Sequence, residues 1–223
     1  MTGAANHSMT DRWVRWAKPL VFALCLTPFV LLVAAALTDR LGANPTEAIT
    51  HSTGDWTLRL LLVTLAMTPL KRLVGRPWPI RFRRMLGLFA FFYACLHLLT
   101  YAWIDQGFDW QGIIEDVVKR PYITVGFSAF LLLIPLALTS TRGMIRRLGR
   151  RWQTLHRAIY AIGILGVVHY LWLVKADTLD PLIYAAVLAV LLLARVPASR
   201  LAAVGRRLTV PGEIGVRHSL RAL

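Results

Sequence analysis

Three histidines lie inside long apolar segments of the chain, where an ionisable side chain is costly and usually has a function. His97 lies in one of these segments, and His156 and His169 lie together in another. The same two segments contain no Asp, Glu or Lys. Two neutral imidazoles that face each other from different helices can hold both axial positions of a haem iron, in a flat and largely apolar cofactor. The residue types therefore predict a haem site.

Depth in the membrane favours His97 and His169 as the ligand pair. His97 lies 12 residues after Met85, and His169 lies 17 residues after Trp152, the residues at which the two apolar segments begin. If both segments cross the membrane in the same direction, both histidines lie in its outer half. His156 lies near the cytoplasmic end of its segment and is the third candidate ligand of haem iron.

A second haem, held by His156, lacks an obvious second histidine. The positions 13 and 14 residues before His97 hold Arg84 and Arg83. In an ideal helix, His156 and His169 point about 140° apart, so both can face one pocket only if the helix is distorted. One haem between His97 and His169 is therefore the primary prediction, and two haems are the alternative.

Small and aromatic residues are expected to shape the pocket. Gly163 and Gly166 are where we expect the helix distortion and the room for a porphyrin. Tyr93 and Tyr101 lie four residues before and after His97, so they are expected to line the same pocket. Neither cysteine belongs to a CxxCH motif, so covalent attachment of a c-type haem is not indicated.

Two adjacent arginines, Arg83 and Arg84, allow two interpretations. They are either a basic anchor at the membrane surface or a clamp for an anionic group of a cofactor. The forked guanidinium matches the oxygens of a haem propionate or a flavin phosphate. On the second interpretation they bind haem or FMN.

The elements that position these side chains are membrane-spanning helices. Hydrophobic residues make up 57% of the 223 residues and gather in runs near the length of about 20 residues that a span needs. We predict an all-α integral membrane bundle of six transmembrane helices over residues 19–196, between an N-terminal segment (1–18) and a C-terminal tail (197–223). The predicted spans are Pro19–Leu37, Trp56–Leu70, Met85–Ile104, Ile123–Ser140, Trp152–Val174 and Pro181–Val196.

Charge predicts the orientation of this bundle. With both termini in the cytoplasm, 20 of the 26 Lys and Arg residues lie in cytoplasmic segments and nine of the 11 acidic residues lie outside. This distribution follows the positive-inside rule and predicts a multi-pass protein of the bacterial inner membrane. It also explains the net charge of +15 without a nucleic-acid partner.

Two other classes of membrane protein are less compatible with the sequence. A proton-coupled transporter would use carboxylates or broken helices within its spans as a relay. A di-iron oxidase would need carboxylates beside its histidines. The predicted spans contain no Asp or Glu, which disfavours both classes.

Several segments resemble the MsrQ (YedZ) family, the haem-binding membrane subunits of the periplasmic protein-methionine-sulfoxide reductase system, within the ferric-reductase-like transmembrane group. The resemblance is carried by GDWTLRLLLVTLAMTPLKR (54–72), RRMLGLFAFFYACLHLLTY (83–101), KRPYITVG (119–126), LALTSTRG (136–143) and RLGRRWQTLHRAIYAIGILGVVHY (147–170). It extends from about Asn44 to Asp180. The chain lacks the GxGxxG motif and the soluble nucleotide-binding domain of larger ferric reductases, so the electron donor must be another molecule.

The resemblance implies b-type haem at His97, His169 and His156, and bound FMN near the arginines that include Arg83 and Arg84. It implies electrons from a cytosolic NAD(P)H-linked flavin reductase or from quinol. They would pass to a periplasmic molybdopterin-dependent subunit that reduces methionine sulfoxide in oxidised proteins. A cytochrome b electron carrier with a different partner is the alternative that these residues leave open.

Overall fold

A computed structural model describes residues 3–174 and 178–196, with side chains from residue 12 onward, and every regular element in that part is helical. The predicted tail (197–223) lies outside the described residues. In chain order the elements are α1 (Gly3–Leu37), α2 (Pro45–Val74), α3 (Ile80–Leu99), the π-helical segment η1 (Thr100–Asp105), α4 (Trp110–Lys119), α5 (Pro121–Leu138), α6 (Arg142–Leu148), α7 (Arg150–Leu155), α8 (Ala158–Leu173) and α9 (Leu179–Leu193).

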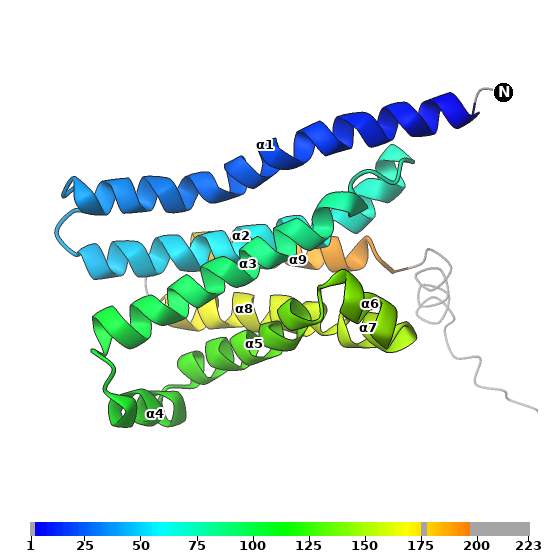
Figure 1. Ribbon diagram of the computed structural model, residues 1–223. Coiled ribbons are helices and arrows are strands. Elements are labelled where there is room, and N and C mark those ends of the chain that lie inside the picture. The colour runs from blue at the N-terminus through cyan, green and yellow to red at the C-terminus, as the bar shows by residue number, and fades with distance from the viewer. Residues whose placement is uncertain (1–2, 175–177, 197–223) are drawn as a thin grey trace, which may run out of the picture.

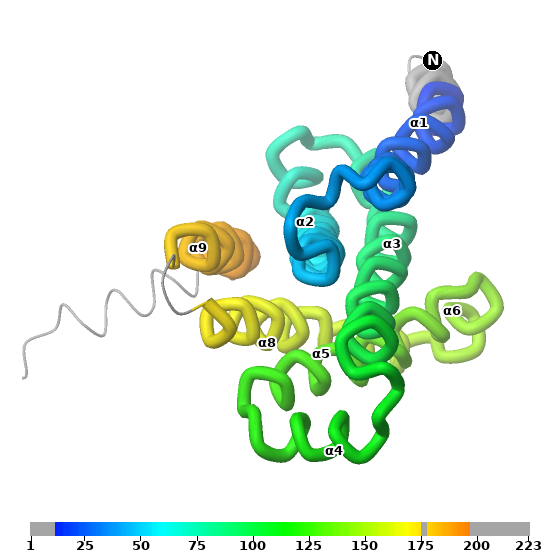
Figure 2. Tube along the Cα trace, turned by 90° about the vertical axis from the view of Figure 1, so that its left-hand side faces the viewer, coloured from blue at the N-terminus to red at the C-terminus, as the bar shows by residue number. Residues whose placement is uncertain are grey.

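Two helical hairpins form the centre of the molecule. Helix α2 packs along α3, and α5 packs along α8 (Figures 1 and 2). Helices α1 and α9 lie at the edges, where α1 packs on α3 and α2, and α9 packs on α8 and α2. Leu65, Ala90 and Ile162 are almost fully buried between the hairpins, so the hairpins share one apolar core.

Four candidate membrane spans identify a membrane protein. The segments Arg12–Leu37, Ile80–Asp105, Pro121–Leu138 and Arg150–Leu173 are long and apolar enough to cross a bilayer. Helix α9 is apolar but has only 15 residues, and α2 has 30 residues, among them Asp55 and Arg59. The all-helical prediction is thus confirmed, whereas six spans remain a prediction.

Several element boundaries differ from the expected ones. Helix α3 begins at Ile80, five residues before the predicted start of its span. The predicted span Trp152–Val174 is broken at His156 and Arg157, between α7 and α8. There the backbone N–H groups donate to carbonyls three residues earlier rather than four, as from Arg157 N–H to the Thr154 carbonyl (3.2 Å). The helix distortion is therefore at His156 itself, and the expectation that it lies near Gly163 and Gly166 was wrong.

Charged residues separate to the two ends of the bundle. The turn between α2 and α3 and the short helices α6 and α7 lie at one end, on the right in Figure 1. This basic end carries Lys71, Arg72, Arg76, Arg81, Arg142, Arg146, Arg147, Arg150 and Arg151. The opposite, acidic end carries Asp39, Glu47, Asp105, Asp109, Glu115, Asp116 and Asp180. Arg40, Lys119 and Arg120 are also at the acidic end, so the described charges are concentrated by sign rather than fully separated.

Helix α1 is joined to the bundle by a buried hydroxyl at a proline. Pro28 lies inside α1 and has no N–H to donate to the Leu24 carbonyl, so the helix is weakened at the next turn of backbone, at Phe29 and Cys25. The Tyr93 hydroxyl bonds to the backbone there, accepting from Phe29 N–H (3.0 Å) and donating to the Cys25 carbonyl (2.8 Å). Tyr93 is 1% exposed, so the hydroxyl makes both bonds away from solvent and ties α3 to α1.

We expect Tyr93→Phe to loosen α1, because the two hydrogen bonds that join α3 to Phe29 and Cys25 would be lost, at a cost of about 0.5–1.5 kcal/mol each. Maleimide labelling of Cys25, which is 5% exposed, should become faster in a background that lacks Cys95. Tyr101→Phe is the matched control, since its hydroxyl bonds to Asp116 and not to α1. Equal labelling rates in the two variants would contradict the role of the Tyr93 hydroxyl in holding α1.

Candidate functional site: a facing histidine pair

His97 and His169 face each other between the two hairpins. His97 lies near the end of α3, and His169 lies near the end of α8, both toward the acidic end. The centres of their rings are 6.2 Å apart and the ring planes are at 80°. The structure therefore brings together the two residues that the sequence predicted as a pair, from different helices and at the same depth.

The spacing of the two rings fits a single metal ion between them. An imidazole nitrogen binds a transition metal at about 2 Å, and the ring centre lies about 1 Å behind that nitrogen. Two imidazoles on opposite sides of one metal would thus have ring centres about 6 Å apart, close to the 6.2 Å observed. Haem iron suits this pair, because the protein needs to supply only its two axial ligands.

Each ring is held by a backbone carbonyl of the partner helix in its own hairpin. His97 Nδ1 lies 3.0 Å from the Thr50 carbonyl oxygen, and His169 Nδ1 lies 2.7 Å from the Tyr122 carbonyl oxygen. A carbonyl only accepts hydrogen bonds, so Nδ1 carries the proton in both rings and Nε2 keeps its lone pair. This is the tautomer in which a histidine binds metal through Nε2.

A glycine allows each ring to approach its carbonyl. A Cβ atom on Gly54 would lie 3.1 Å from His97 Cε1, and one on Gly126 would lie 2.7 Å from His169 Nδ1. Real Cβ atoms do not come as close as the second distance, so only glycine fits at position 126. Each glycine lies one helical turn after the carbonyl that binds the ring, at Thr50 and Tyr122.

The same local unit therefore occurs twice in the chain. The carbonyl, the glycine and the histidine belong to Thr50, Gly54 and His97 in the first hairpin. In the second hairpin, 72 positions later, they belong to Tyr122, Gly126 and His169. The sequence analysis assigned no role to either glycine. The signal was a glycine followed 43 residues later by a histidine, in two hairpins that otherwise share few identical residues.

Four residues expected around the pocket have other partners. The Tyr93 hydroxyl bonds to α1, and the Tyr101 hydroxyl donates to Asp116 (2.9 Å). A Cβ on Gly163 would meet Leu188 and one on Gly166 would meet Leu58, so these glycines face α9 and α2. The expectation that they open the haem pocket was wrong, because contacts between helices decide which glycine faces which helix.

His156 is apart from the other two histidines. Its Nε2 lies 3.0 Å from the Thr139 hydroxyl, and the Trp152 ring stacks on it with a centre distance of 3.9 Å. Trp152 also donates to the Thr139 carbonyl (3.0 Å). His156 thus forms a compact unit with the end of α5, at the basic end of the molecule.

Arg83 and Arg84 have different environments, although they are adjacent in α3. Arg83 is partly buried and lies within electrostatic range of His156, Tyr160 and Arg195. Arg84 is exposed. The structure therefore separates the two arginines that the sequence treated as a pair.

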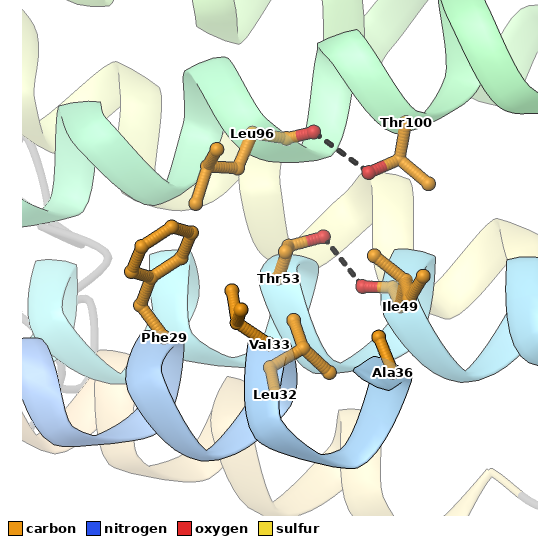
Figure 3. Close-up of a pocket in the computed structure, with 8 residues that line it drawn as sticks. All are labelled: Phe29, Leu32, Val33, Ala36, Ile49, Thr53, Leu96 and Thr100. Carbon is orange, nitrogen blue, oxygen red and sulfur yellow. Dashed lines mark hydrogen bonds between the residues drawn. The ribbon is translucent and has the colours of Figure 1, made fainter. Parts of the chain in front are cut away.

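A small apolar cavity of about 120 Å³ lies beside the His97 unit, between α1, α2 and α3 (Figure 3). Thr53 and Thr100, which line it, donate their hydroxyls to the Ile49 and Leu96 carbonyls of their own helices. The cavity thus presents no free polar group, and it contributes packing space rather than ligands.

Comparison with known proteins places the chain in a family. The family model described as "Ferric reductase like transmembrane component" matches residues 53–167. Haem-binding subunits MsrQ of protein-methionine-sulfoxide reductase from three bacteria are similar over most of their length. The Herminiimonas arsenicoxydans protein is 59% identical over 80% of this chain and 84% of its own. The Rhodospirillum rubrum protein is 54% identical over 92% and 99%, and the Azospira oryzae protein is 56% identical over 82% and 79%.

The chain belongs to the MsrQ family. The resemblance found in the sequence is thereby confirmed, and the membrane character agrees with the transmembrane family model. No solved structure matches the chain. The matched region begins one residue before Gly54 and includes His97 and Gly126, so most of both repeated units lies inside it.

We expect Gly126→Ala to disturb the His169 ring, because the new methyl group would occupy the position where the ring meets α5. Loss of such an outer contact typically lowers the affinity for a metal about 10- to 100-fold. Haem per purified chain should fall, and the signal of low-spin iron in electron paramagnetic resonance should shift.

Gly87→Ala is the matched control, because its nearest neighbour would be Thr64 Cγ2 at 3.7 Å, an ordinary contact. Haem content and resonance signal that are the same in the Gly126 and Gly87 variants would refute the role of Gly126.

Proposed function

We propose that this protein binds haem b between His97 and His169 and is the electron-transferring membrane subunit of a protein-methionine-sulfoxide reductase system. The observation that carries the proposal is the pair of facing imidazoles, each with Nδ1 fixed on a backbone carbonyl. Bound haem would supply a reversible one-electron couple at that position. The relatives' description as haem-binding subunits supports the same assignment.

The direction of transfer follows from the proposed orientation. We place the basic end in the cytoplasm, because positively charged segments remain on that side of the membrane. The donor is then a cytosolic flavin reductase or quinol, with FMN as an intermediate carrier. The acceptor is a periplasmic molybdopterin-dependent subunit that reduces methionine sulfoxide. In this orientation the His97–His169 pair, near the ends of α3 and α8 toward the acidic end, lies on the acceptor's side of the bacterial inner membrane.

The residues of this chain hold the two ligand rings in place before haem binds. The Thr50 and Tyr122 carbonyls fix both tautomers, and the two glycines let α2 and α5 approach the rings closely. Rings fixed in this way need little reorganisation when the iron changes charge. Such a site suits repeated electron transfer better than the binding and release of a substrate.

We expect His97→Ala and His169→Ala each to abolish or sharply reduce haem binding, because each removes one axial ligand. The measurement is the spectrum of the purified, dithionite-reduced protein, normalised to chain concentration. His51→Ala is the control, since His51 is exposed at the start of α2. Full haem content in both ligand variants would overturn the site.

His156 remains a candidate for a second haem, but it would first have to release the Thr139 hydroxyl from its Nε2. We therefore expect one haem per chain in the wild type and an unchanged haem content in His156→Ala. A pyridine haemochrome assay against quantified protein gives the number. Two haems in the wild type and one in the variant would show that His156 is also a ligand.

A further inference from the structure

A short amphipathic helix lies at the acidic end, between the ends of two candidate spans. Helix α4 (Trp110–Lys119) begins five residues after the span Ile80–Asp105 ends, and it ends two residues before the span Pro121–Leu138 begins. Because successive Cα atoms are only about 3.8 Å apart, α4 must lie close to the membrane surface. Figure 2, which views the bundle from the acidic end, shows α4 lying across the direction of the spans rather than along it.

One exposed stripe of α4 is apolar. Ile113 and Val117 are half-buried on the side where α4 packs on α5. Trp110, Ile114 and Val118 follow one another at intervals of four residues, so they form a stripe about 80° wide next to that side. All three are exposed, and none of the ten residues of α4, all of which the structure describes, is fully buried. The stripe therefore has no partner within the bundle.

A polar stripe lies beside the apolar one, on the side away from the bundle. Gln111, Glu115 and Lys119 each come one residue after a member of the apolar stripe, or about 100° round the helix. All three are exposed, and Glu115 and Lys119 form an ion pair. Adjacent apolar and polar stripes are typical of a helix that lies in the plane of a membrane surface. Because the ion pair balances the charges of the stripe, binding to anionic lipids is not required.

Three exposed aromatic rings continue the apolar stripe toward the end of the preceding span. The Trp103 and Phe108 rings stack with centres 6.4 Å apart, and the Phe108 and Trp110 rings are 5.8 Å apart. Phe108 has a φ of 61°, in the left-handed region that a bulky side chain rarely adopts, so its place between the two tryptophans costs backbone energy. Tryptophan is enriched where a membrane meets water, because its ring is apolar and its N–H is polar. The row of rings thus favours lipid as the material that covers the stripe.

A carboxylate on the bundle side of α4 fixes the helix to both neighbouring spans. One oxygen of Asp116 accepts from the Tyr101 hydroxyl and from Gln106 Nε2, both at 2.9 Å, and the other oxygen pairs with Arg120 Nε at 3.0 Å. Tyr101 lies in η1, Gln106 follows η1, and Arg120 directly precedes α5. The apolar stripe therefore stays at a fixed height relative to the two spans.

We propose that α4, together with Trp103 and Phe108, is a membrane-interface anchor that inserts Trp110, Ile114 and Val118 among the lipids at the acidic end. Lipid is the occupant because the stripe begins and ends within a few residues of two spans and continues their exposed apolar surface. The anchor determines how deep this end of the bundle lies in the membrane. The inference goes beyond the proposed function and depends neither on haem nor on the direction of electron transfer.

The test compares two neighbouring positions that the protein leaves similarly exposed. Ile114 is 65% exposed, and the Glu115 side chain is 53% exposed. Ile114→Cys and Glu115→Cys are made separately in the full chain with Cys25→Ala and Cys95→Ala, labelled with a nitroxide and placed in phosphatidylcholine nanodiscs. Power-saturation electron paramagnetic resonance then measures collisions with oxygen, which concentrates in lipid, and with a water-soluble nickel chelate. The ratio of oxygen to nickel collisions should be several-fold higher for the label at position 114.

Val118→Cys and Gln111→Cys form a second pair, with the same contrast expected between the apolar and the polar stripe. A size-exclusion profile and a thermal unfolding curve like those of the unlabelled chain show that each variant is folded, and the second pair replaces the first if one fails. Adding phosphatidylglycerol should leave the contrast unchanged. A contrast that appears only with this anionic lipid would contradict insertion of the apolar stripe.

Labels that collide mainly with the nickel chelate on both stripes would refute the anchor, because the apolar stripe would then be in water. The anchor is also refuted if the label at position 114 leaves water only after a periplasmic catalytic subunit is added. In that case a protein, and not lipid, would cover the stripe. Neither result would bear on the histidine pair, whose haem content is measured separately.

Discussion

The hydrogen bond from each imidazole to a backbone carbonyl of a neighbouring helix is the constraint on which the rest of this structure depends. A carbonyl within a helix usually accepts from an N–H of its own helix, so a second donor must come very close to reach it. That approach is possible only where no side chain intervenes, at Gly54 and Gly126. The position of the glycine therefore determines both how closely the two helices pack and how the ring is oriented, and this holds separately in each hairpin.

Prolines have a related role at two other places. Pro28 and Pro69 each leave a backbone group without its usual partner inside an apolar bundle, where water is not available. Beside Pro28, the Tyr93 hydroxyl from α3 bonds to Phe29 N–H and the Cys25 carbonyl of α1. Arg195, two residues after α9, donates to the Leu65 carbonyl in α2, which Pro69 leaves without its helical donor. A defect within one helix thus becomes a specific link between helices, and the peripheral helices α1 and α9 are attached in this way.

The sequence predicted those features that depend on residue type and on spacing within one segment. Apolar runs located the long helices, and the depth of His97 and His169 in their segments predicted that they meet. Features set by contacts between segments were not predictable in this way. Gly163 and Gly166 looked suitable because they share a helix with His169, yet the glycines that touch the rings come from α2 and α5.

Two further differences have similar causes. At the break, His156 lies beside the Thr139 hydroxyl and Trp152 donates to the Thr139 carbonyl, so both side chains meet the end of α5, and no glycine or proline marks the position. Helix α4 lies in a stretch that was expected to be an outer loop. Its start was marked by Asp109, which caps the helix by accepting from Gln111 N–H. That signal was present in the sequence, but it is weak beside the apolar runs.

The repetition of one carbonyl–glycine–histidine unit, 72 residues apart, has a consequence for the origin of the fold. The iron of a porphyrin has two equivalent axial sides, and each hairpin supplies what one side needs. A single hairpin of this kind, associating with a second copy of itself, would already hold iron from both sides with two-fold symmetry. Once both copies are in one polypeptide, they no longer need to remain identical. One can then acquire Arg84 and the other His156 at corresponding positions, while His97 and His169 still face each other.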